Sequence, residues 1–168
     1  RLKGGLGTAS FADADLTVGA LAAVNSMGEA VIPGTRTFWA WQLEQAGELG
    51  HQAPPAGVPG GLGFDFAGAT PRNTTLGVVA TDAALTRDQA LRVGVMAQDG
   101  IARAIRPAHG PLDGDTVFVL STGMRALPDP LADLGRIGLL AGDALARAIM
   151  RGVHAAEALP GLSAWRDP

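Results

Sequence analysis

Apolar runs bounded by Gly, Pro and polar residues predict strands near the start of the chain. The run Leu16–Asn25 (LTVGALAAVN) is predicted to be a buried strand. Ser26–Gly28 is predicted to be a turn, and Ala30–Pro33 the start of a return strand. These segments together predict a hairpin.

The second half of the chain alternates between short apolar runs and longer helical patterns. Thr75–Ala80 (TLGVVA) and Thr116–Leu120 (TVFVL) are predicted strands. Thr86–Arg106 is predicted to be a helix, because Thr86 is a suitable N-cap and Pro107 a stop signal. A long Ala- and Leu-rich helix is predicted at Asp133–Glu157.

Both predicted helices carry apolar residues at helical spacing. In the first helix these residues are Leu91, Val95, Ile101 and Ile105. In the second they are Leu134, Ile137, Leu140, Leu145, Ile149 and Val153. The second helix also has apolar residues off this stripe, namely Leu139, Ala146, Met150 and Ala155. We therefore expect one of the two helices to contribute to a subunit contact in a homo-oligomer.

The order strand, helix, strand, helix predicts an α/β fold whose helices cover one face of a sheet. The length of 168 residues suits one structural domain. A Pro- and Gly-rich segment, 52–72, divides the chain and is predicted to be an exposed, cleavable loop. The sequence thus has two parts, 1–73 and 74–168.

Composition and charge exclude several classes of function. The net charge is −3 and no run of Lys or Arg occurs, which argues against a nucleic-acid or membrane partner. The chain has no Cys, and its three His residues show no ligand spacing, so we predict no metal and no cofactor. No apolar stretch reaches the roughly 18–20 residues of a spanning helix. A cytoplasmic protein is expected.

The step from Asn73 to Thr74 is the first candidate for chemistry. Cleavage between these residues, by an N-to-O acyl shift and hydrolysis, gives Thr74 a free amine beside its hydroxyl, so that one residue holds both nucleophile and base. The step taken alone is more typical of a turn Asn before a strand. It also matches a glycosylation sequon.

Three further polar residues stand at ends of the predicted strands. Asp113 and Asp115 flank Gly114 just before a strand, and neighbouring carboxylates of this kind can share a proton and orient a hydroxyl or an ammonium group. A plain Asp-Gly turn is the alternative. Asn25 ends a strand, where its amide can donate a hydrogen bond to an oxyanion. As a single residue it is more typical of a turn.

The segment Lys3–Thr8 (KGGLGT) is rich in Gly. Its Lys precedes the glycines and no predicted strand comes before it, which excludes a phosphate-binding loop. The segment is predicted to be a flexible turn.

Four segments together resemble the N-terminal-nucleophile family that contains the β-peptidyl aminopeptidases, the D-stereospecific aminopeptidases and the nylon-oligomer hydrolases. These segments are KGGLGTAS (3–10), VGALAAVNSMGEAV (18–31), NTTLGVVATDAAL (73–85) and PLDGDTVFVLSTG (111–123). The resemblance implies a four-layer αββα sandwich. It also implies a precursor that is cleaved before Thr74, and an assembly of processed subunits.

The resemblance further implies roles for individual residues. Asn25 matches the oxyanion donor, Lys3 falls where the hydrolases carry an active-site Lys, and Asp113 and Asp115 match their acidic pair. The aminopeptidase branch uses Ser as nucleophile with a Ser/Glu pair, so Thr74 with two Asp residues is more similar to the nylon-hydrolase branch. Family precursors are longer before the nucleophile, so we expect a further segment upstream of Arg1.

These observations predict a self-processing amide hydrolase that acts on a small peptide or amide oligomer. One alternative is an aminopeptidase for β-peptides or D-amino acid amides. An acetyl-transferring ornithine enzyme also uses a self-released Thr, but its sequence does not resemble NTTLGVVAT. The alternative outside enzymes is a catalytically silent domain that acts by assembly.

Overall fold

The computed structural model describes residues 2–13, 15–57 and 73–167. In these residues four strands form one sheet, in the order β1 (Leu6–Ala12), β2 (Thr17–Asn25), β3 (Thr74–Ala83) and β4 (Thr116–Arg125). The β1–β2 and β2–β3 pairs are antiparallel, whereas β3 and β4 are parallel.

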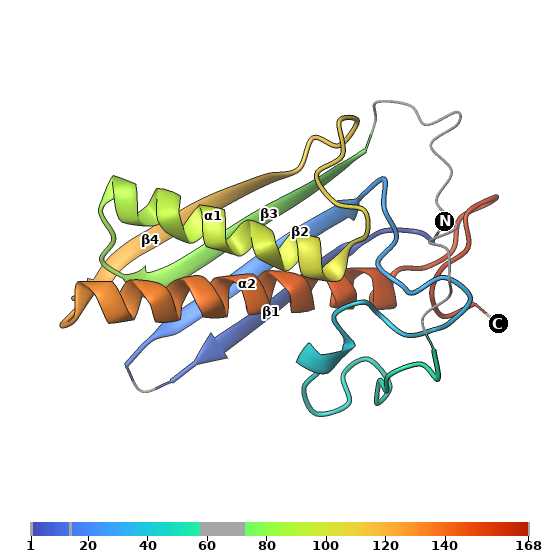
Figure 1. The fold of residues 1–168 in the computed structure, drawn as a ribbon, viewed down its shortest axis with the longest axis horizontal. Helices are drawn as coiled ribbons and strands as arrows, with labels where there is room; N and C mark the ends of the chain where they lie inside the picture. Colours follow the sequence, from blue (N-terminus) through green and yellow to red (C-terminus); the bar gives the residue numbers. More distant parts are fainter. Residues whose placement is uncertain (1, 14, 58–72, 168) are drawn as a thin grey trace.

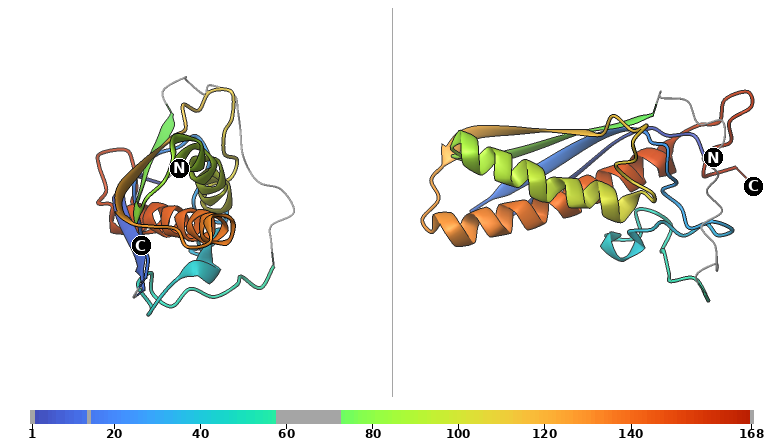
Figure 2. Two further views of the ribbon diagram at one scale, coloured as in Figure 1. Left: turned by 90° about the vertical axis from the view of Figure 1, so that its left-hand side faces the viewer. Right: turned by 45° about the horizontal axis from the view of Figure 1, so that its top comes forward.

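Two helices, α1 (Arg87–Ala104) and α2 (Pro130–Ala155), run along one face of this sheet (Figures 1 and 2). Helix α1 makes the crossover between the parallel strands β3 and β4, as parallel pairing requires. A short 3₁₀ helix, η1 (Trp41–Leu43), lies in the long connection between β2 and β3. The structure therefore has one sheet layer and one helix layer.

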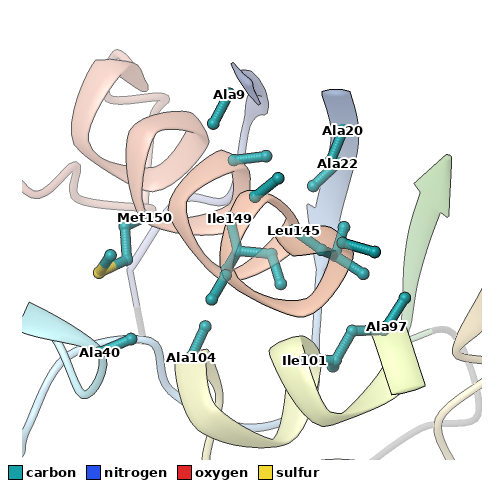
Figure 3. Close-up of a cluster of buried hydrophobic side chains, with 14 of the residues drawn as sticks. Ala9, Ala20, Ala22, Ala40, Ala97, Ile101, Ala104, Leu145, Ile149 and Met150 are labelled. Carbon is teal, nitrogen blue, oxygen red and sulfur yellow. The ribbon is translucent and has the colours of Figure 1, made fainter. Parts of the chain in front are cut away.

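The core between these layers is built from small and branched side chains. Figure 3 shows Ala97 and Ile101 of α1 beside Leu145 and Ile149 of α2, and all four are fully buried. Small residues let the two helices approach closely: a Cβ atom added to Gly100 would lie 2.3 Å from the carbonyl oxygen of Gly142. The helices are therefore in backbone contact at this point.

Five of the predicted elements are confirmed, with shifted ends. The runs beginning at Leu16, Thr75 and Thr116 are in β2, β3 and β4, and the predicted helix after Thr86 is α1. Thr86 accepts a hydrogen bond from the backbone of Gln89, whose side chain bonds back in a capping box. The long helix at Asp133–Glu157 is α2, which begins earlier, at Pro130.

The predicted hairpin is wrong. Ala30–Pro33 forms no strand, and in this segment Val31 makes only an isolated bridge to Phe38. The partners of β2 are β1 and β3, so Leu6–Thr8 belongs to a strand and not to a flexible turn. Gly7 is needed in that strand because a Cβ there would lie 2.2 Å from the Ala148 carbonyl oxygen of α2. The close packing of β1 on α2 thus requires glycine in the strand, a residue that is otherwise typical of loops.

The predicted apolar stripe of α1 is wrong in its first half. Leu91 and Val95 are 69% and 52% exposed, whereas Val93 and Ala97 are fully buried. The helix turns its small residues to the core, since these permit the contact with α2. On α2, the off-stripe residues Ala146 and Met150 are buried within this chain, while Leu139 is exposed.

The face of the sheet that points away from the helices is apolar. Alternate residues of the strands lie there, since neighbouring positions on a strand face opposite sides. The large exposed side chains on this face are Leu6, Leu21, Leu76, Phe118 and Leu120. An uncovered apolar face of this size is typical of a surface that another layer covers.

The predicted division of the chain at 73/74 falls at the first residue of β3. The larger part of the predicted cleavable loop, 58–72, lies outside the described residues. In the described part of the chain, no helix has both the length and the apolar character needed to span a membrane.

Candidate active site

Asn25 and Thr74 are cross-strand neighbours at one end of the sheet. Asn25 is the last residue of β2 and Thr74 the first of β3, and the two are paired in the antiparallel register. Directly opposed residues project to the same face of a sheet. The strand pairing therefore brings together two residues that are about fifty positions apart, on the face away from the helices.

The hydroxyl of Thr74 lies against the peptide bond that the sequence predicts to be cleaved. Its Oγ1 atom donates a hydrogen bond of 2.6 Å to the carbonyl oxygen of Asn73. Asn73 is buried, and its carbonyl oxygen also accepts a 2.9 Å hydrogen bond from the backbone N–H of Gly114. The candidate nucleophile and the candidate scissile carbonyl are thus held in contact.

The two carboxylates bind backbone amides on either side of this point. Asp113 Oδ1 accepts the N–H of Met27 at 3.0 Å, just beyond the end of β2. Asp115 Oδ1 accepts the N–H of Thr75 at 2.8 Å. The pair therefore fixes the ends of β2 and β3 relative to each other, and with them the spacing of Asn25 and Thr74.

The remaining oxygen atoms of the pair differ in their surroundings. Asp113 Oδ2 is buried and has no hydrogen-bond partner among the described residues. Asp115 Oδ2 lies 3.0 Å from His109 Nδ1 and also accepts the backbone N–H of His109 at 3.2 Å. The Asp115 side chain is only 4% exposed, and a buried polar group of this kind needs hydrogen-bond partners such as these.

Sequence reasoning missed His109 as a member of the site, because the three His residues were considered only as metal ligands. A usable signal was present: His109 stands only six residues before Asp115. In the structure its φ of 55° is a left-handed conformation, which His adopts more readily than most residues.

Lys3 lies near Asn25 but does not reach the nucleophile. Both residues line a cavity of about 310 Å³ beside the end of β2. The ammonium group of Lys3 donates to the carbonyl oxygen of Gly4 at 2.8 Å. The structure thus brings together Asn25, Thr74 and the acidic pair, and places Lys3 at the neighbouring cavity.

This geometry suits acyl transfer and contains no cluster for a metal. Among residues 2–13, 15–57 and 73–167, no group of three or more His, Asp or Glu side chains is placed to hold an ion. The model of the family named Peptidase family S58 matches residues 1–165. The chain belongs to peptidase family S58.

Relatives of this S58 chain carry aminopeptidase names. An uncharacterized aminopeptidase of Mycobacterium tuberculosis is 44% identical over 181 residues, which cover 99% of this chain and 52% of the relative. An uncharacterized aminopeptidase of Mycobacterium leprae is 39% identical over 175 residues, covering 98% of this chain and 48% of the relative. The chain therefore spans about half the length of these relatives.

A solved structure shows the fold of this S58 chain. The L-aminopeptidase D-Ala-esterase/amidase of Ochrobactrum anthropi, described as a variant of the Ntn hydrolase fold, has a TM-score of 0.60 at 24% identity, with 99% of this chain and 46% of that chain covered. The predicted fold class is confirmed. The four-stranded sheet and the layer of two helices are two of the layers of this fold. The nylon-hydrolase branch stays a prediction.

Proposed function

We propose that the full-length protein is a self-processing amide hydrolase with Thr74 as its N-terminal nucleophile. One observation carries the proposal: the Thr74 hydroxyl is in contact with the Asn73 carbonyl, at 2.6 Å, at the start of β3. Membership of peptidase family S58 supports a reaction on peptide or amide bonds. Because Thr74, Asp113 and Asp115 resemble the residues of the nylon-oligomer hydrolases, the proposed substrate is an amide oligomer.

In turnover, the free amine of Thr74 acts as the general base. A terminal amine has a reference pKa of about 7.7–8.0, so a useful fraction is unprotonated at neutral pH. Thr74 Oγ gives its proton to this amine and attacks the substrate carbonyl, while the amide of Asn25, its cross-strand neighbour, donates to the oxyanion. Water then cleaves the acyl-enzyme.

The second candidate is an aminopeptidase, which removes residues only from the N-terminus of a substrate. The names of the mycobacterial relatives favour it. A panel of β-amino acid amides, D-amino acid amides and aminohexanoate oligomers separates the two. Release of single N-terminal residues from the amides indicates an aminopeptidase, whereas cleavage inside the oligomers indicates an endohydrolase.

Intact-mass measurement of the full-length protein tests the nucleophile. We expect a fragment that begins at Thr74, and we expect Thr74→Ala to stay uncleaved while Thr74→Ser is cleaved. Efficient cleavage of the Ala variant would contradict the mechanism. A wild-type protein that stays a single folded chain without amidase activity would instead support a silent, assembling domain.

A further inference from the structure

The carbonyl oxygen of Asn73, in the bond that is to be cleaved, accepts two hydrogen bonds. Thr74 Oγ1 donates at 2.6 Å and the backbone N–H of Gly114 at 2.9 Å. A carbonyl oxygen has two lone pairs, so both donors can be accommodated at once. Only one of the two donors can keep its hydrogen bond once the reaction begins.

Addition of Thr74 Oγ to the Asn73 carbonyl turns this oxygen into an oxyanion. The hydroxyl becomes the nucleophile and gives up its proton, so it can no longer donate to the oxygen. The N–H of Gly114 stays where it is. A donor that is fixed in advance on a developing oxyanion is one of the largest contributions to acyl-transfer catalysis.

We propose that the backbone N–H of Gly114 is the oxyanion donor of the autocleavage reaction. This inference rests on the proposed function, and it gives the Asp-Gly-Asp turn a catalytic group that neither carboxylate supplies. The carboxylates then act as positioning groups. Asp113 holds the backbone of Met27, and Asp115 holds that of Thr75, at 3.0 and 2.8 Å.

The step balances without any added reactant except water. Thr74 Oγ bonds to the Asn73 carbonyl carbon, and the carbon–nitrogen bond to Thr74 breaks. The hydroxyl proton ends on the Thr74 nitrogen, which leaves as an amine. One water then hydrolyses the ester, giving the Asn73 carboxylate and the free Thr74 hydroxyl.

Glycine at position 114 is required by the space that the Thr74 side chain occupies. The φ angle of Gly114 is outside the left-handed region, so the backbone conformation does not require glycine. A Cβ atom there would lie 2.8 Å from Thr74 Oγ1, closer than a carbon and an oxygen atom normally approach. Glycine is thus needed to let the nucleophile occupy its place beside the N–H donor.

The decisive experiment replaces one backbone atom. In the full-length protein, glycolic acid at position 114 changes the amide N–H into an ester oxygen and leaves the shape unchanged. We expect the rate of fragment release, followed by intact mass, to fall by about 10²–10³-fold. The matched control is the same replacement at Gly34, a turn glycine with open space around its Cβ position, which should be processed at the wild-type rate.

A second variant covers the case in which the ester protein loses its fold by circular dichroism. Gly114→Ala keeps the N–H but crowds Thr74 Oγ, and it should also process slowly. Wild-type processing of a folded Gly114 ester overturns the inference. If the ester protein does not fold, wild-type processing of Gly114→Ala overturns it, because the Thr74 hydroxyl then does not need its place beside the Gly114 N–H. Failure of the wild-type protein itself to cleave would instead overturn the proposed function.

Discussion

The imidazole of His109 lies 3.0 Å from the carboxylate of Asp115, which in turn holds the backbone of Thr75. This chain of contacts connects an exposed ring to the residue that follows the candidate nucleophile. Because Asp115 is nearly fully buried, the orientation of its carboxylate depends on the partners it has there.

His109→Asn should therefore lower the turnover number about tenfold, a loss of about 1.4 kcal/mol of transition-state stabilisation. Asn tolerates the left-handed conformation but is too short to keep the ring contact. The control is His51→Asn, which has a similar φ of 60°. Steady-state kinetics on the processed enzyme measure both, and equal turnover in the two variants would contradict a positioning role.

The acidic pair provides a second prediction. Asp115→Asn should reduce turnover by about 10²-fold or more, because an amide cannot accept from Thr75 and His109 as the carboxylate does. Asp113→Asn is expected to act in the same range through Met27. Far-ultraviolet circular dichroism should stay unchanged. Near-normal activity of both variants would reduce the Asp-Gly-Asp segment to a structural turn.

A third prediction concerns stability away from the site. Arg147 of α2 is 4% exposed, and its guanidinium pairs with Glu48 at 2.8 Å. Glu48→Ala leaves this buried charge without its partner and should lower the free energy of unfolding by about 3 kcal/mol. Asp99→Ala, an exposed change on α1, should stay within about 0.5 kcal/mol of wild type. Chemical denaturation of the full-length protein measures both, and equal stability would refute the assignment.

The fourth prediction concerns assembly, which we propose to be a homo-oligomer of processed subunits. Leu91 and Val95 are exposed one helical turn apart on α1, and this surface is the best candidate for a subunit contact. Leu91→Asp combined with Val95→Asp should lower the molar mass in light scattering. Ala158→Asp, an exposed change after α2, is the control for an added surface charge. A monodisperse, active wild-type monomer at micromolar concentration would refute the proposal.

Local signals were sufficient for the elements that carry strong, self-contained patterns. The strands β2, β3 and β4 each contain a short apolar run, and α1 begins at a complete capping box. The missed strand β1 has the small residues of a loop, because Gly7 and the preceding Gly5 are required by the close approach of α2 and not by the local backbone. The strand propensity of a residue does not take such a contact with a distant helix into account.

The sequence by itself determined the candidate chemistry: Thr74 after Asn73, the amide of Asn25 and the acidic pair were all found from residue type and position. Only the tertiary structure decided what each group touches. It placed the carboxylates on backbone amides, His109 on Asp115, and the N–H of Gly114 on the Asn73 carbonyl. The physical reason is that the contacts of Asp115 with Thr75 and of Gly114 with Asn73 join segments far apart in the chain, through the parallel pairing of β3 with β4. A backbone N–H, moreover, is the same in every residue type except proline.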